Sequence, residues 1–154
     1  MSTKIVARIT EMLRDRSVAG PVSGQAVLQA EDALGVIFPT SYRLFLLNFG
    51  SGTIGLYEIF GLSEVDSPDG PPLWRSVVQE TTRSRKAGRG SIPNEYVAFT
   101  SDGQGCKFYL DTARTDATGE CHVIAWGPGV EGVVVASSFF EFIDRASQGF
   151  RLTT

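Results

Sequence analysis

The chain has 154 residues, a formal net charge of −3, 42% hydrophobic residues and 20% charged residues. This length suits one domain, which buries roughly 70% of the surface of the unfolded chain, and the composition excludes intrinsic disorder. The acidic balance argues against direct nucleic-acid binding, which normally needs a basic face, and favours a basic protein partner.

The N-terminal segment predicts an amphipathic helix over residues 4–16. Its apolar residues recur at helical spacing: Ile5, Ile9, Met12 and Leu13. The charges scattered through this segment exclude the apolar stretch of a secretory signal, and no run of about 18 apolar residues exists for a membrane span. We therefore expect a cytoplasmic protein, in which Cys106 and Cys121 remain free thiols.

Two further helices are predicted before residue 50. The first covers residues 24–34 and ends at Gly35. The second covers residues 40–48, after Pro39, whose fixed φ suits a first helical turn. It ends at Gly50, because glycine is the usual residue for a left-handed position after a helix.

The rest of the chain predicts strands, a polar surface helix and a final helix. The apolar residues near 54–60 favour extended structure, and the polar stretch TTRSRKAGRG is typical of the end of a surface helix and its loop. The strongest β pattern is the hairpin YVAFTS, Asp102-Gly103, CKFYLD, and further strands follow at CHVIAW and VVVA. Ser138 and Glu141 then form a capping box for the last helix.

These elements predict an α+β fold in a single domain over residues 1–154, with a core of about 24–147. Strands joined by short turns pair antiparallel, so we expect an antiparallel sheet of about five strands. Its strands are expected near 54–60, 95–101, 105–111, 121–126 and 132–136. Helices 24–34, 40–48 and 138–147 should pack on one face.

Two glycine patterns match the dinucleotide fingerprint G-x-G-x-x-G, at residues 50–55 and 127–132. The fingerprint needs a strand before the loop and a helix after it, so that the helix amides face the pyrophosphate. The first pattern follows a helix, and the second runs into the β-branched VVVA. We therefore interpret them as a helix end and a hairpin turn, and predict no cofactor.

The remaining polar groups also favour structural roles. His122 is the only histidine, and its neighbour Cys121 points to the opposite face of a strand, so no metal site is predicted. Asp102 and Asp111 are paired carboxylates suited to acid-base work or to a cation, but a turn and a strand end explain them better. No catalytic residue is predicted. The basic cluster Arg83, Arg85, Lys86 and Arg89 reads as a solvated surface, because no aromatic residue interleaves with it.

One long segment, AEDALGVIFPTSYRLFLLNFGSG, resembles the SUKH superfamily. Its pattern is an acidic helix, a Leu-Gly stop, a proline, a tyrosine-containing helix and a glycine-rich turn, at Glu31, Leu34, Gly35, Pro39, Tyr42, Phe45, Leu46 and Gly50. Further matches are LYEIFGL, IPNEYVAFTSDGQGCKFYLD, the strand containing Trp126 and SSFFEFI. These positions are mostly apolar, glycine, proline or turn residues, so the resemblance implies a fold and transfers no catalytic residues.

The SUKH superfamily includes the fungal Smi/Knr cell-wall regulator and many bacterial immunity proteins encoded beside polymorphic toxins. The resemblance therefore implies a non-catalytic binding protein. The first hypothesis is an immunity protein for a cognate, basic toxin domain such as a nuclease. The alternatives are a Smi/Knr-like regulatory module and a small nucleotide-dependent enzyme.

An uneven charge distribution suggests where a partner binds. Between Arg43 and Arg75 there is no lysine or arginine. The stretch holds Glu58, Glu64, Asp66 and Asp69, and Asp102 of the hairpin turn is a further candidate for the partner-binding surface. A basic toxin surface would be attracted to such a field. Alternation along the strand allows Tyr57 or Phe60 to be exposed as an aromatic anchor beside the acids. The competing interpretation is a solvated acidic loop with Tyr57 in the core.

Overall fold

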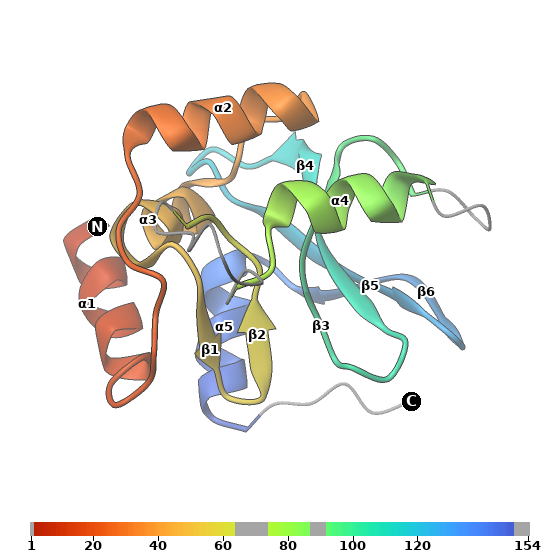
Figure 1. Ribbon diagram of the computed structural model, residues 1–154. Helices are drawn as coiled ribbons and strands as arrows, with labels where there is room; N and C mark the ends of the chain where they lie inside the picture. The colour runs from red at the N-terminus through yellow and green to blue at the C-terminus, as the bar shows by residue number, and fades with distance from the viewer. Residues whose placement is uncertain (1, 64–73, 87–91, 150–154) are drawn as a thin grey trace, which may run out of the picture.

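The computed structural model describes residues 2–63, 74–86 and 92–149 of the chain. Within these ranges lie five helices and six strands (Figure 1). The helices are α1 (Ser2–Met12), α2 (Gly24–Leu34), α3 (Thr40–Phe49), α4 (Val77–Lys86) and α5 (Phe139–Ser147). The strands are β1 (Gly52–Ile54), β2 (Tyr57–Ile59), β3 (Tyr96–Ser101), β4 (Lys107–Thr115), β5 (Cys121–Gly127) and β6 (Val130–Ala136). All strand pairs are antiparallel, which confirms the predicted α+β class.

The helix ends follow the local sequence closely. The Ser23 hydroxyl accepts the Ala26 N–H at 3.1 Å at the start of α2, and Gly35 ends this helix with a φ of 69°. Ser138 caps α5 in the same way, as the capping box predicts. The N-terminal helix is shorter than the predicted 4–16, because α1 ends at Met12 and Asp15 has a φ of 64°, which is left-handed rather than helical.

The main sheet has four strands in the order β3-β4-β5-β6, rather than about five. The predicted strand near 54–60 is instead a separate hairpin, β1–β2, that turns at Gly55 with a φ of 61°. A β-carbon at Gly55 would lie 2.3 Å from the Ala146 carbonyl oxygen on α5. The turn therefore depends on a close approach to a helix that is distant in sequence, which a local pattern does not reveal.

Alternate side chains of the sheet contact different helices. Phe99, Phe108 and Leu110 are fully buried in the main core, where Phe142 of α5 lies 5.0 Å from the Phe108 ring. Lys107 points the opposite way and donates to the Ser84 hydroxyl of α4 at 3.1 Å. Helix α5 thus covers one face, as predicted, and α4 additionally contacts the other face beside β3.

The centre of the core is a group of aromatic rings from α3, β3 and α5. Tyr42 is fully buried, and its ring lies 5.0 Å from Phe139 and 5.2 Å from Phe38. Burial raises the pKa of Tyr42 well above its ordinary value, and its hydroxyl donates to the Phe60 carbonyl at 2.6 Å. This bond joins α3 to the end of the β1–β2 hairpin.

The β4–β5 connection docks on the N-terminal end of α3. The Thr40 N–H donates to the Gly119 carbonyl at 2.9 Å. The Glu120 carboxylate accepts the Ser41 N–H at 3.0 Å and the Ser41 hydroxyl at 2.8 Å. A carboxylate at this position accepts hydrogen bonds from free amides of the first helical turn and lies next to the positive end of the helix dipole.

Candidate partner-binding groove

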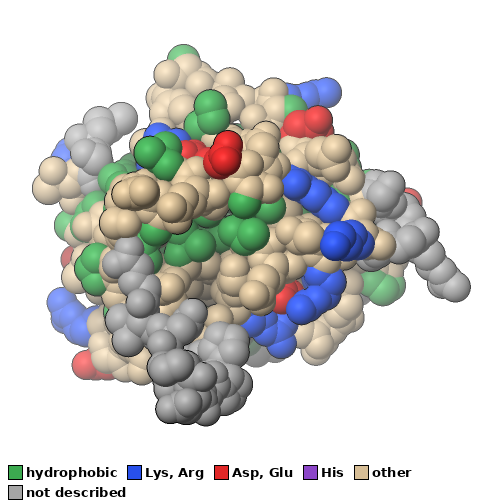
Figure 2. Space-filling model, turned by 45° about the horizontal axis from the view of Figure 1, so that its top comes forward, with side chains coloured by type: hydrophobic (Ala, Val, Ile, Leu, Met, Phe, Trp, Pro, Cys, Tyr) green, Lys and Arg blue, Asp and Glu red, His purple; other side chains and the backbone are tan. Residues whose placement is uncertain are grey.

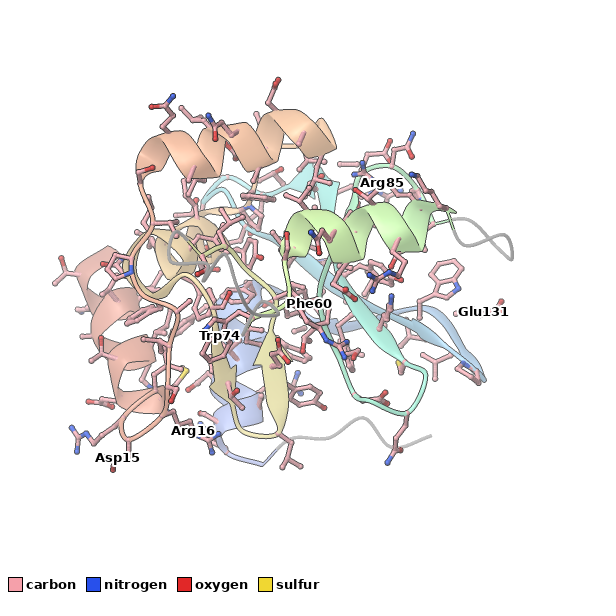
Figure 3. The ribbon with its side chains drawn as sticks, in the orientation of Figure 1. Asp15, Arg16, Phe60, Trp74, Arg85 and Glu131 are labelled. Atoms are coloured by element: carbon pink, nitrogen blue, oxygen red, sulfur yellow. The ribbon has the colours of Figure 1, made fainter. Side chains whose placement is uncertain are left out.

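The two aromatic residues proposed as anchors are both buried. Tyr57 is 3% exposed and packs against the rings of Phe108 and Phe142, at 5.7 and 5.3 Å. Phe60 is 2% exposed and has the Arg75 guanidinium 5.9 Å from its ring centre; Figure 3 places it near the start of α4. The aromatic-anchor interpretation is therefore wrong, and the competing interpretation that Tyr57 lies in the core is confirmed.

The proposed acidic residues are only partly within the described chain. Glu64, Asp66 and Asp69 lie outside the described residues. Glu58 accepts the Arg75 N–H at 3.0 Å, and Asp102 accepts the N–H groups of Gln104 and Cys106 at 2.7 and 3.0 Å. Asp102 is thus a turn residue, as its position before glycine indicates. A joint acidic surface of these residues stays a prediction.

A groove of about 750 Å³ lies between α2 with the loop after it and the end of β4. Figure 1 shows the C-terminal end of β4 close to α2. We call it the α2–β4 groove; its lining includes Leu28, Asp32, Val36, Ile37, Glu95 and Thr115. Apolar and acidic side chains thus share one concave surface, which sequence reasoning did not identify.

The first wall of the groove is built by a buried acid. The Glu31 carboxylate on α2 accepts the Phe38 N–H at 2.7 Å, and its backbone carbonyl accepts the Val36 N–H at 3.1 Å. Arg43 of α3 forms an ion pair with the same carboxylate. These bonds fix residues 35–38 between two helices, so that Ile37 is 75% exposed although its neighbour Phe38 is buried.

The second wall is the part of β4 that extends past β3. The pairing of β3 with β4 reaches Tyr96 opposite Asp111, while β4 continues to Thr115. Just beyond the pairing, both the N–H and the hydroxyl of Thr112 donate to the Glu95 carbonyl, at 3.1 and 2.6 Å. The exposed Glu95 is thereby held beside the groove.

The ionisable residues that line the groove are Glu31, Asp32 and Glu95, all acidic. The exposed Arg114 of β4 lies between the lining residues Thr112 and Thr115 but is not itself in the lining. Two other arginines contact the walls and are already paired. Arg43 pairs with Glu31, and Arg85 donates to the carbonyls of Leu34, at 3.0 Å, and Asn94. Burial lowers the pKa of Arg85, although the nearby negative charge of Glu95 acts to raise it. Asp32 and Glu95 are both exposed and give the groove an acidic rim.

The basic cluster read as a solvated surface has a partly structural role. Arg83 pairs with Glu80 at 2.7 Å, while Arg85, labelled on α4 in Figure 3, joins that helix to α2 and to the loop before β3. Lys86 is exposed, and Arg89 lies outside the described residues. Spacing within the cluster gave no signal for the long-range bonds of Arg85.

The glycine patterns have the structural roles that were predicted. Gly50 ends α3 with a φ of 74°, and β1 follows it, while Gly129 lies in the turn between β5 and β6. Neither pattern is followed by a helix. His122 is exposed on β5. In the described ranges no three His, Cys, Asp or Glu residues gather closely enough to hold a metal ion. Over the same ranges, none of the helices has the length and apolar character needed to cross a bilayer.

Comparison with known proteins identifies a family but no individual curated relative. No curated protein matches this sequence. The family described as SMI1-KNR4 cell-wall, SUKH_5, matches residues 4–148. This range runs from α1 to α5 and contains both walls of the α2–β4 groove. The chain therefore belongs to the SMI1-KNR4 cell-wall family of the SUKH superfamily.

Proposed function

We propose that this chain is a non-catalytic immunity protein that neutralises a cognate toxin domain, such as a nuclease, in the cytoplasm. The observation that carries the proposal is the family match over residues 4–148, because the family is generally of a protein-binding, immunity type. Immunity by binding requires a surface that covers the toxin, and no chemistry of its own.

The roles of the polar residues support a binding function. Glu31, Glu58, Asp102 and Glu120 each accept backbone N–H groups that fix a loop, a turn or a helix end. Carboxylates used in this way are part of the scaffold. The exposed apolar and acidic side chains of the α2–β4 groove offer a surface for a protein partner.

The proposal is tested with the neighbouring gene. Where a large secreted protein with a variable C-terminal domain is encoded beside this chain, expression of that domain alone is expected to arrest growth. Co-expression of this chain should restore growth, and the two purified proteins should elute together in size-exclusion chromatography. If growth stays arrested and no complex forms, the chain is not the immunity protein for that domain.

A regulatory module with a cellular partner is the second candidate, and the cell-wall description of the matched family favours it. The same gene neighbourhood separates the two, since a regulator needs no adjacent toxin gene. A nucleotide-dependent enzyme, the third hypothesis, predicts thermal stabilisation by a nucleotide. We expect no shift of the melting temperature with ATP or NAD.

A further inference from the structure

We propose that the α2–β4 groove is the docking site for a basic segment of the partner protein. In this arrangement an apolar side chain of the partner packs between Leu28 and Ile37, and its lysines or arginines face Asp32 and Glu95. The identity of the partner as a toxin domain rests on the proposed function. The location of the site rests on the geometry of the groove.

The first support is the clustering of exposed apolar side chains. The exposed large hydrophobic residues of the described ranges are Val18, Leu28, Ile37, Leu56, Val133 and Val134. Leu28 and Ile37, 64% and 75% exposed, line the same concavity. Single exposed hydrophobic residues are ordinary on a protein surface, whereas a pair that shares a groove with polar residues around it is typical of a binding site.

The second support is the rigidity of Ile37. Glu31 holds the N–H groups on both sides of Ile37, that of Val36 through its carbonyl and that of Phe38 through its carboxylate. Pro39 restricts the loop further, because its ring fixes its own φ and limits the backbone of Phe38. A loop whose backbone is already fixed loses little backbone entropy when a partner covers it, which favours affinity.

The third support is the charge of the rim. Asp32 and Glu95 are exposed in the lining, while Arg43 and Arg85 already pair with a carboxylate or with carbonyl groups. The exposed Arg114 of β4 is not in the lining, so the two acids outnumber it. The rim therefore attracts a basic partner. Figure 2, turned so that the side of α2 comes forward, shows exposed hydrophobic side chains close to carboxylates. Opposite charges across an interface mainly accelerate association and suppress wrong partners.

Among the described residues, the exposed apolar pair on β6 does not share a groove with acidic residues. Val133 and Val134 are neighbours on the edge strand β6, whose Val135 carbonyl already accepts a bond from Arg145 at 2.8 Å. An edge strand occupied in this way is less available for pairing with another chain. The α2–β4 groove is therefore the better docking surface.

The test uses the full chain and the C-terminal domain encoded by the adjacent toxin gene. The apolar variant is Leu28→Ser with Ile37→Ser, and its matched control is Leu56→Ser, which is 67% exposed in the β1–β2 turn. The apolar variant is expected to weaken binding by about thirtyfold or more, as the loss of two central contacts implies, and the control by less than about twofold.

The charge variant is Asp32→Lys with Glu95→Lys, and its matched control is Glu131→Lys on β6, away from α2 in Figure 3. Stopped-flow association at low salt should slow by about tenfold for the charge variant, with a much smaller difference at high salt. The control should match the wild type at both salt concentrations. Circular dichroism verifies that every variant is folded.

Hydrogen–deuterium exchange on the wild-type complex gives a readout that needs no variant. Protection on binding is expected at residues 28–37 and 112–115. If the wild-type chain binds but both groove variants bind normally, or protection appears only elsewhere, the groove is not the docking site and the immunity function stands. If the wild-type chain does not bind the domain at all, the proposed immunity function is wrong. The toxin domain is then also not the partner that occupies the groove.

Discussion

The carboxylate of Glu31 lies 2.7 Å from the backbone nitrogen of Phe38, so a buried acid on α2 fixes the loop that leads into α3. Glu31 is 6% exposed and shares its carboxylate with Arg43. The acidic residue of the segment that resembles the SUKH pattern is thus a structural group at the base of the α2–β4 groove.

Replacing Glu31 should destabilise the fold. Glu31→Ala leaves the Phe38 N–H without its acceptor and Arg43 without its partner, and we expect a loss of about 2–3 kcal/mol in the free energy of unfolding. Urea denaturation measures this change. The matched control is Asp32→Ala at the exposed neighbouring position, which should change stability by less than about 0.5 kcal/mol. Equal stability of the two variants would contradict the role of Glu31.

Gly61 is expected to tolerate no side chain. A β-carbon there would lie 1.8 Å from the Gly50 carbonyl oxygen and 2.7 Å from the Ser51 hydroxyl. Gly61→Ala should destabilise the protein by about 2–3 kcal/mol or more, since backbone must move. Gly24→Ala is the control, because an added β-carbon meets nothing within 4 Å there, and it should be neutral or slightly stabilising. A Gly61→Ala protein with wild-type stability in urea would show that the close approach does not exist.

The acid dependence of stability should reveal the bonds that the Glu141 carboxylate accepts from Ser137, the residue before the N-cap of α5. Hydrogen bonds from the Ser137 N–H and hydroxyl hold the pKa of Glu141 below its ordinary value, and Arg145 adds to this effect. Because the folded pKa is the lower one, the ionised carboxylate stabilises the fold above the unfolded pKa of about 4.3, and this contribution disappears as pH falls through the folded value. The advantage of the wild type over Glu141→Gln in urea denaturation should therefore shrink as pH falls from the unfolded pKa through the folded pKa.

Glu120 provides a control of opposite sign. Burial raises its pKa despite the bonds from Ser41. Its ionisation therefore opposes folding, so the wild type should lose stability relative to Glu120→Gln as pH rises from the unfolded pKa of about 4.3 through the folded value. If both variants showed the same trend with pH, the assignment of the two shifts would be wrong.

The cysteines should behave as two unreactive free thiols. Both are buried and unpaired, and burial with the charges of Asp111 and Glu120 raises the pKa of Cys121 to about 12. Burial also raises the pKa of Cys106. Because the thiolate is the reactive form, the native protein should react slowly with a disulfide reagent at about pH 8. After denaturation without reductant, two thiols per chain should react with the reagent. A linked pair detected by mass spectrometry in fresh lysate would contradict this expectation.

The sequence predicted those parts of the fold that depend on neighbouring residues. Gly35, Gly50 and Ser138 mark helix ends through local geometry, and β-favouring residues between turn signals mark β3 to β6. The β1–β2 hairpin was predicted as one strand, because the approach of Gly55 to Ala146 that accompanies its turn is a tertiary contact.

The candidate site depends almost entirely on such distant contacts. Ile37 and Thr115 line one groove although they are far apart in the sequence. A local signal did exist at Ile37, an apolar residue two positions before Pro39, but its exposure follows from the bonds of Glu31. Charge counting along the chain instead selected Glu58, Glu64, Asp66 and Asp69, and the last three lie outside the described ranges.

The docked β4–β5 connection determines where this fold can accept extra residues. An added β-carbon at Gly119 would lie 2.4 Å from the Thr40 hydroxyl, so an insertion at this hairpin tip would separate Glu120 from α3. At Gly103, in the β3–β4 turn, nothing lies within 4 Å of that position. Exposed turns with free space tolerate insertions best. A fluorescent label or an affinity tag placed after Gly103 should therefore leave the protein folded, whereas the same insertion at Gly119 should detach one hairpin from the helices.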